Sequence, residues 1–570
     1  MDNQRLLLWS ALAVAVFLNV QAWQHDDTPA PGAPTAAVVP AGAATPATTP
    51  ATTATKTLAD SLPGVAATPA APAPERAPQA AVDTAASRSV PVVRVRTDVL
   101  ELAISTEGGE IREATLLRYP RQKDTPNQLL SLLTVEGPDS PSVLQWGLTA
   151  GGAGAEPNHK ALFNSVAASY ELKDGQRELV VPLTWTDGAG LTVTRSIRLT
   201  RGSYAIDLTQ HVENAGNAPW RGRGYSQLLR HWERAERSMW NPETSSFKGP
   251  AIYDGRKYQK LEVEKPNPDL LPKTPIAGGW AAALQHHFVA AMIPDPSLPA
   301  EYGLEVQEKN FLLRVAGPVQ EVAAGAALDF KEKLFVGPKL QDELAATAPE
   351  LDRTADYGRL TILARPLFWL LSHVHRVVGN WGFTIIIVTF LIKLCFYPLA
   401  QTSGRSMARM RTLAPRMKLI QERYKDDREQ LGKQMMELYK REKVNPLAGC
   451  LPIVVQIPVF IAFYWVLLES VEMRQAPFLL WVQDLSTRDP YFVLPAIMGA
   501  AMFGQFKLNP APPDPMQAKI FAFMPLVMTV MMAFFPAGLV LYWITNTGLS
   551  IAQQWRINQL VAAEDQKGRS

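Results

Sequence analysis

WGFTIIIVTFLIKLCFYP, residues 381–398, is an apolar run interrupted by one ionisable side chain, Lys393. Because about 20 apolar residues cross a bilayer as a helix, the run predicts transmembrane helix 2. A lysine at the centre of a membrane helix costs about 2.5–3.5 kcal/mol, so Lys393 needs an explanation. One is a working site that faces a polar cavity. The other is snorkelling, because Tyr397 and Pro398 follow closely and a lysine side chain is long enough to reach the interface.

Four further apolar segments between residues 450 and 556 predict transmembrane helices 3–6. They are Cys450–Leu468, Tyr491–Phe506, Lys519–Phe535 and Ala537–Trp555. Upstream, residues 346–380 read as a connector. Its second half, 359–378, spaces leucines at helical intervals with arginines and histidines between them, which is typical of an amphipathic helix that lies in the interface. Gly379 and Asn380 should end that helix.

Residues 399–449 are polar and basic, with twelve Lys or Arg against six Asp or Glu, a local charge of +6. Apolar residues at alternating three- and four-residue spacing predict a helical hairpin with a short seam. The positive-inside rule places this hairpin in the cytoplasm. The basic residues of the hairpin either form a solvated surface or contact anionic lipid, the ribosome or a targeting partner, and both alternatives stay open.

The N-terminal part divides into three segments. Residues 1–23 contain an apolar run that is ambiguous between a signal peptide and an anchor by length, and residues 24–89 are an Ala/Pro/Thr-rich stretch that predicts a disordered linker. Residues 90–345 show period-two alternation and predict one large antiparallel β-sandwich, with the clearest hairpin from Glu178 to Thr209. If the β-domain lies outside the cytoplasm, the apolar run in residues 1–23 must span the membrane. The chain then has six transmembrane helices, with residues 557–570 as a cytoplasmic tail and both termini cytoplasmic.

Composition excludes several classes of protein. The formal charge of +3 gives no reason to expect a nucleic-acid partner. Cys395 and Cys450 both lie in apolar segments and are interpreted as buried thiols rather than a disulfide or metal pair. No metal, nucleophile or cofactor motif is present, so we expect neither a cofactor nor an enzyme. The adjacent His286 and His287 would point to opposite faces of a strand.

The polar residues inside the predicted spans include Thr389, Gln456, Asn546 and Ser550, but no carboxylate. Thr389 lies four residues before Lys393 and therefore on the same helix face. Hydroxyls in membrane helices most often bond their own backbone, whereas a primary amide such as Gln456 needs several partners. An ion-coupled carrier would be expected to carry buried carboxylates, and an intramembrane protease would need a nucleophile with its base or a metal pair. The sequence shows neither pattern, which disfavours both classes of protein.

The chain closely resembles the YidC insertase family. Five stretches carry the resemblance: WGFTIIIVTFLIK (381–393), EKVNPLAGCLPIVVQIPVF (442–460), QAPFLLWVQDLSTRDPYFVLPAIMG (475–499), DPMQ (514–517) and FPAGLVLYWITN (535–546). Motifs of this length in this order are highly specific. The resemblance covers residues 359–556 strongly and extends more loosely to the N-terminal run and the β-domain, whose size resembles the supersandwich of Gram-negative members.

The resemblance implies a polytopic helical membrane protein of the bacterial inner membrane, in which five helices form an insertase core and a large β-sandwich domain is periplasmic. It implies a hydrophilic groove that opens to the cytoplasm and to lipid. Lys393 stands where many members have arginine, which keeps the charge but loses bidentate carboxylate binding. Clients would pass between two sets of residues, namely Pro452, Gln456, Pro458 and Phe460 on one side and Met528 and Met532 on the other.

The expected function is that of a membrane-protein insertase and chaperone for nascent clients, working alone or with the Sec translocon. Lys393, Thr389 and Gln456 would solvate a polar client segment while its apolar helix enters the lipid bilayer. The expected partners are clients, lipid, the Sec translocon and the ribosome. Two alternatives stay open: a structural factor that gathers already inserted helices, and a channel or transporter.

Overall fold

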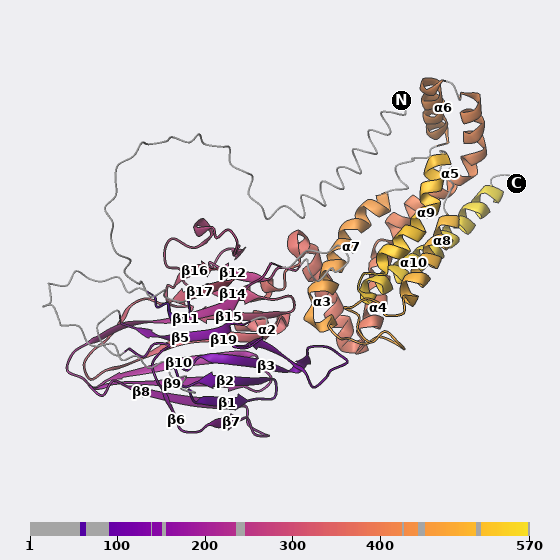
Figure 1. Ribbon diagram of the computed structural model, residues 1–570. Coiled ribbons are helices and arrows are strands. Elements are labelled where there is room, and N and C mark those ends of the chain that lie inside the picture. The colour runs from indigo at the N-terminus through magenta and orange to yellow at the C-terminus, as the bar shows by residue number, and fades with distance from the viewer. Residues whose placement is uncertain are drawn as a thin grey trace, which may run out of the picture.

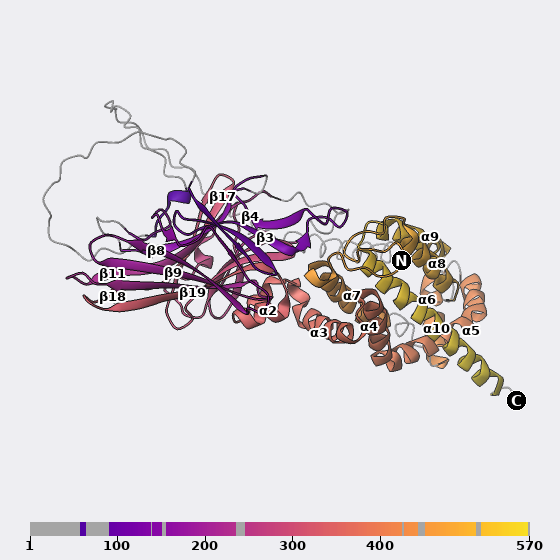
Figure 2. The ribbon, with the colours of Figure 1, turned by 90° about the horizontal axis from the view of Figure 1, so that it is seen from below.

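The computed structural model describes residues 58–63, 90–137, 140–150, 156–234, 246–424, 427–442, 451–508 and 515–567. These residues form a β-domain and a helical part that lie side by side (Figure 1). Figure 2 shows the helices α2 (Gln341–Thr347) and α3 (Thr361–Val378) between the sheets and the other helices. The expected helix in residues 1–23 lies outside the described residues.

The β-domain contains two sheets. One has ten strands in the order β16-β17-β11-β5-β3-β2-β1-β7, with β18 on β11 and β4 on β3; the other has nine, in the order β13-β12-β14-β15-β19-β10-β9-β8-β6. The strand bounds are β1 Val92–Arg96, β2 Leu100–Ser105, β3 Ile111–Pro120, β4 Leu129–Leu133, β5 Ser142–Thr149, β6 Asn164–Ser165, β7 Ser169–Glu171, β8 Glu178–Thr186, β9 Leu191–Thr200, β10 Ala205–Asn214, β11 Trp220–His231, β12 Gly249–Tyr253, β13 Tyr258–Lys260, β14 Trp280–Leu284, β15 Phe288–Pro294, β16 Glu301–Gln307, β17 Asn310–Ala316, β18 Gln320–Val322 and β19 Ala327–Pro338.

The predicted hairpin is confirmed. β8 pairs antiparallel with β9, and β9 with β10. Alternate residues of β9 are buried, as period two requires when one face of a sheet covers a core. The turn forms because the Asp187 carboxylate accepts hydrogen bonds from the backbone N–H groups of Ala189 and Leu191, and Gly188 adopts a positive φ of 73°.

His286 and His287 do not lie within a strand, as their expected orientation to opposite faces assumed. The segment 280–293 folds as two strands, β14 and β15, and the two histidines occupy the turn between them. Their rings therefore stack at a centroid distance of 3.8 Å instead of pointing to opposite faces. The prediction was wrong because it assumed a continuous strand.

The helical part is built from eight long helices in the described residues. They are α3 Thr361–Val378, α4 Trp381–Cys395, α5 Tyr397–Arg423, α6 Arg428–Arg441, α7 Leu451–Glu469, α8 Val493–Leu508, α9 Pro515–Met532 and α10 Ala537–Lys567. As predicted, α3 ends at Gly379, which has a positive φ of 71°. Asn380 begins α4, since its side chain accepts a hydrogen bond from the N–H of Phe383.

The predicted helix 381–398 is broken near its end. α4 stops at Cys395 and α5 starts at Tyr397 with a bend of 65°. Pro398 explains the break, because proline fits the first turn of a helix but not its interior. Cys395 is exposed at this bend, which corrects its interpretation as a buried thiol; Cys450 lies outside the described residues.

By length and apolar composition, no single helix of the described residues suffices to cross a membrane, whereas the bent pair Trp381–Cys395 and Tyr397–Ser406 passes together. The number of transmembrane helices stays a prediction. The seam of the helical hairpin is present: Leu413, Met417 and Leu438 are buried between α5 and α6.

The two parts meet at a polar joint. Arg474, in the segment between α7 and α8, donates hydrogen bonds to the carbonyls of Pro120 and Arg121 at 2.8 and 2.9 Å. His286 contacts the carbonyl of Leu468 at 2.9 Å, and the Ser246 hydroxyl donates to Glu469 at 3.2 Å. The β-domain is thus fastened to the end of α7.

Residues 24–89 were predicted to be a disordered linker. This expectation lies outside the described residues except at 58–63, where Leu58–Asp60 form a short 3-10 helix. That segment packs against the β-domain, so the linker is not without structure throughout.

Candidate functional site

Lys393 lies in the last turn of α4 and reaches across to α10. Its ammonium donates a hydrogen bond of 2.8 Å to the hydroxyl of Ser550. That hydroxyl in turn donates to the carbonyl of Asn546, one turn earlier, at 2.8 Å. Its own hydrogen is therefore committed, and a lone pair is left to accept from the lysine.

A small cavity of about 40 Å³ adjoins this contact. Four helices contribute to its walls, which are formed by Thr389, Ile392, Lys393, Phe396, Leu399, Ala400, Gln456, Val459, Tyr542 and Asn546. Since roughly 10–15 Å³ of such a cavity suffices for one water molecule, there is room for a few waters or a small polar side-chain tip. Within the described residues, this volume is far too small for a polypeptide segment.

Neutral polar groups of the cavity, Thr389 and Gln456, have hydrogen-bond partners, whereas the charge of Lys393 has no counter-charge among the described residues. Thr389 is buried and its hydroxyl donates to the carbonyl of Ile385 at 2.6 Å, as expected of a membrane-helix threonine. Gln456 hydrogen-bonds to the Tyr542 hydroxyl. In the described part of the chain, no carboxylate acts on the Lys393 ammonium. The site therefore offers a cation held by neutral groups.

Only three of the eight expected site residues, Lys393, Thr389 and Gln456, line the cavity. Phe460 instead packs edge-on against Trp543 with ring centroids 4.6 Å apart. Met532 is buried in the core of the helical part and Met528 packs against that core. Pro458 is half-buried in α7 without lining the cavity, and the side chain of Pro452 lies outside the described residues.

Three residues of the site, Tyr542, Asn546 and Ser550, were not among the expected site residues, although Asn546 and Ser550 were noted as polar residues inside a predicted span. They are spaced four residues apart and therefore lie on one face of α10. The sequence contained only part of this signal, because Tyr542, Asn546 and Ser550 recur every fourth position but Thr545 and Thr547 add polar residues outside that face. What it lacked was the pairing of α10 with α4.

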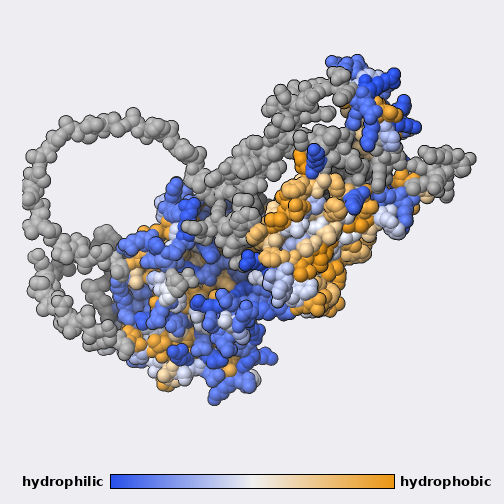
Figure 3. Space-filling view, turned by 45° about the vertical axis from the view of Figure 1, so that its right-hand side comes forward, coloured by the Kyte–Doolittle hydropathy of each residue, from blue (hydrophilic) through white to orange (hydrophobic). Residues whose placement is uncertain are grey.

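The helical part also exposes a wide apolar surface. Figure 3 shows it between the hydrophilic β-domain and the hydrophilic tip that α5 and α6 form. Exposed large apolar residues of the helical part include Phe390 and Leu394 of α4 and Phe521, Phe523, Leu526 and Val530 of α9, each more than a third exposed. A soluble protein rarely exposes so much apolar surface, so a lipid environment accounts for it.

The comparisons agree with this layout. The family model for the YidC periplasmic domain matches residues 92–370, and the model for the 60Kd inner membrane protein family matches residues 373–564. Together they describe the chain as an inner-membrane protein with a periplasmic domain.

Curated relatives narrow the class further. The membrane protein insertase YidC of Nitrosococcus oceani is 44% identical over 99% of this chain and 100% of its own length. That of Methylococcus capsulatus is 47% identical over 82% of this chain and 86% of its own length. A crystal structure of an active YidC insertase covers 81% of this chain and 93% of that one, at 16% identity and a TM-score of 0.36. The chain belongs to the YidC family of membrane-protein insertases.

Proposed function

We propose that Lys393 and the groups around it transiently solvate a polar segment of a nascent client while the client's apolar helix moves into lipid. The observation that carries this is a lysine that contacts a neutral hydroxyl instead of a carboxylate. Two charges 4 Å apart attract by about 4 kcal/mol at an effective dielectric of 20. That is enough to offset much of the cost of an acidic residue near hydrocarbon, about 2.5–3.5 kcal/mol.

The size of the cavity limits the mechanism. A volume of about 40 Å³ admits a side-chain tip or a few waters, not a helix. We therefore infer contact at the mouth of the site and lateral movement along the exposed apolar surface, with no threading through a pore. Burial of the client's apolar residues drives insertion, so no nucleotide is required. The small volume of the cavity also disfavours the channel alternative.

We propose further that six helices span the inner membrane, with both termini and the α5–α6 hairpin in the cytoplasm and the β-domain in the periplasm. The excess of basic residues in 399–449 supports this orientation. Chaperone activity on inserted clients, cooperation with the Sec translocon and ribosome contact through the basic hairpin belong to the same proposal.

The central test is Lys393→Ala in cells depleted of the native protein. Insertion of single-span clients with an acidic translocated segment should fall about tenfold, equivalent to about 1.4 kcal/mol. Lys507→Ala is the matched control, because Lys507 is also a lysine near a helix end but lies over Phe503 instead of the cavity. Lys393→Arg should retain most activity. Full insertion by Lys393→Ala for all such clients would defeat the proposal.

Crosslinking separates insertion from mere assembly of helices. A photoreactive residue at position 456 should form an adduct with a ribosome-stalled client before its helix has inserted. The same residue at 503, on the exposed surface, serves as control for nonspecific contact in lipid. A structural assembly factor would give the adduct at 456 only after insertion.

A further inference from the structure

Residues 58–63 of the linker pack against the outer face of the ten-stranded sheet. Leu58 and Ala59 cover an apolar cluster of three side chains, Val143 of β5, Leu229 of β11 and Leu312 of β17. These three are at most 6% exposed. Their neighbours in sequence, such as Leu144, Leu228 and Leu313, belong to the core between the sheets. By strand alternation, the cluster faces away from that core.

The three side chains form a cross-strand row. Leu229 pairs with Val143 on one side and with Leu312 on the other. The parallel row two residues along consists of Gln145, Gln227 and Arg314. An apolar row beside a polar row suits a peptide whose side chains pack on the first while its backbone bonds to the second.

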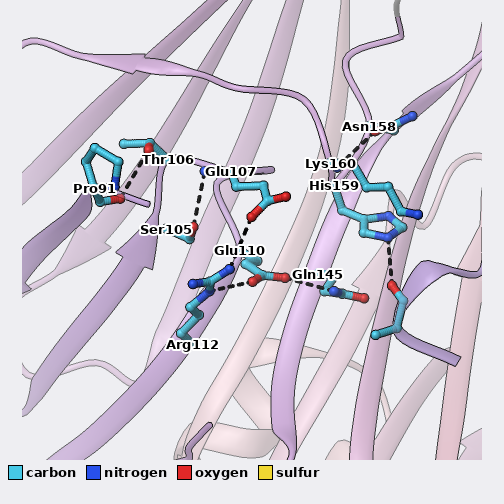
Figure 4. Close-up of polar contacts among 11 residues, drawn as sticks. Pro91, Ser105, Thr106, Glu107, Glu110, Arg112, Gln145, Asn158, His159 and Lys160 are labelled. Atoms are coloured by element: carbon cyan, nitrogen blue, oxygen red, sulfur yellow. Dashed lines mark hydrogen bonds and ion pairs between the residues drawn. The ribbon is translucent and has the colours of Figure 1, made fainter. Parts of the chain in front are cut away.

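The side chains of the polar row hydrogen-bond to one another as well as to the segment. Gln227 accepts a hydrogen bond from Arg314 at 3.2 Å and donates to Gln145 at 2.8 Å. Its second amide hydrogen goes to the carbonyl of Ser61 at 3.2 Å. Gln145 is itself held by Glu110 at 2.8 Å (Figure 4). Binding to a row held by these mutual hydrogen bonds loses little side-chain entropy.

His159 supplies a second backbone contact. Its Nε2 donates to the carbonyl of Ala59 at 3.0 Å (Figure 4), while its Nδ1 lies 2.6 Å from the Tyr225 hydroxyl. Burial lowers the pKa of His159, so the ring is neutral and Nδ1 accepts from the tyrosine. Two further contacts involve side chains of the segment and can therefore distinguish one peptide sequence from another. Lys160 pairs with Asp60 at 2.6 Å, and the Ser61 hydroxyl donates to Glu305 at 3.2 Å.

We propose that this face of the β-domain is a peptide-binding site, and that the chain's own segment Leu58–Pro63 is its bound ligand. The site recognises two backbone carbonyls, a small apolar pair and an acidic residue that follows the pair. A separate peptide of the same chemistry competes with the segment. The site lies on the β-domain and is independent of the cavity at Lys393.

The test uses the full chain and a labelled peptide, TLADSLPG, which copies residues 57–64. In the variant Leu58→Asp/Ala59→Asp, the chain's own segment should leave the site. The peptide should then bind saturably, and at least about tenfold more tightly than to the native chain, because a tethered ligand competes at an effective concentration in the millimolar range. Circular dichroism and client insertion should be unchanged.

A charge swap tests the register. A peptide with Asp60→Lys should bind about two- to fivefold more weakly, as expected for an exposed ion pair, and Lys160→Glu in the chain should restore it. A peptide of scrambled sequence is the control. Absence of saturable binding to the folded double variant, or equal binding to that variant and the native chain, would overturn the proposal.

Discussion

Two lysines of this chain sit in contrasting surroundings, one at the joint and one in the helical part. Lys339 is 2% exposed, and its ammonium donates to the carbonyl of His286 at 2.9 Å. Glu469 and Asp356 share a cavity of about 60 Å³ with it. Lys393 is half-buried and bonds to a serine. The first cation has acidic neighbours, whereas the second has none in the described residues.

The difference separates a lysine with acidic neighbours from the one to which our proposal assigns a role in client insertion. Burial lowers the pKa of Lys339, and the carboxylates of Glu469 and Asp356 oppose that shift. The buried Lys339 thus lies beside Glu469, where the β-domain meets the end of α7. No carboxylate of the described residues balances the charge of Lys393, so under our proposal this charge is available to an incoming group. Each substitution below tests one side of this contrast.

The largest effect is expected from Glu469→Ala. Breaking a buried charge pair costs about 3–5 kcal/mol, and the loss should lie toward the lower end of that range because Asp356 remains beside the buried Lys339. Urea unfolding in detergent micelles should show this loss of stability. The double variant Lys339→Met/Glu469→Leu should recover most of it.

Lys393→Met is the counterpart on the other side of the contrast. It removes a charge that has no acidic partner, so stability should stay within about 1 kcal/mol of the native chain while client insertion falls. A stability loss at Lys393 as large as that at Glu469 would contradict the distinction between the two lysines.

The β-domain was readable from sequence because period-two alternation reports burial directly. The hairpin from Glu178 to Thr209 was therefore predicted together with its turn. The helix end at Gly379 was predicted because glycine readily adopts the positive φ that ends a helix. The turn at His286 and His287 was missed because no glycine, proline or asparagine marks it. Its position is set by contacts with Leu468 and Lys339, which are remote in sequence.

The site was predictable only within one helix. Thr389 and Lys393 share a face by their spacing, and the α10 residues Tyr542, Asn546 and Ser550 share another. Which face meets which depends on helix packing, and single-sequence periodicity cannot supply it. Met532 illustrates the limit: apolar composition is the same whether a methionine lines a client path or, as here, fills the core.

Acid should weaken the joint through its two histidines. Burial, with Lys339 nearby, lowers the pKa of His286 to about 3, and burial also lowers that of His287. An unfolded histidine has a pKa of about 6.5, so the stability from neutral burial is complete above that pH and is lost progressively below it. At pH 5.5 the loss is about 1.4 kcal/mol for each histidine, or about 3 kcal/mol for both.

The measurement compares the native chain with His286→Gln/His287→Gln at pH 7.5 and 5.5. This difference is needed because burial raises the pKa of Glu472 to about 7, which stabilises the fold as the pH falls and works against the histidines. The stability gap between the two chains should shift by about 3 kcal/mol in favour of the glutamine variant at pH 5.5. A gap that does not change with pH would rule out the histidine effect.

Gly382→Ala should disturb the first turn of α4, where it packs against Phe478, and spare the Lys393 cavity. A Cβ at Gly382 would lie 2.0 Å from Cδ2 of Phe478, so the ring must move. Overpacking of this kind costs about 1–3 kcal/mol. Gly548→Ala is the matched control, since a Cβ there meets nothing within 4 Å. Only the first variant should lower the melting temperature; equal shifts would exclude the contact as the cause.

The smallest effect is expected from Ser550→Ala, which removes the hydroxyl that holds Lys393. Hydrogen bonds between membrane helices contribute about 0.6 kcal/mol on average, so insertion of acidic clients should fall only about threefold. Thr545→Ala is the control: Thr545 donates to its own helix at Leu541, at 2.9 Å, and does not touch Lys393. If the hydroxyl positions the lysine, insertion should drop for Ser550→Ala alone, and Lys393→Ala should mask it in the double variant. Additive losses in that double variant would instead mean that Ser550 acts independently of the lysine, and the cation would then be held by the cavity walls rather than by α10.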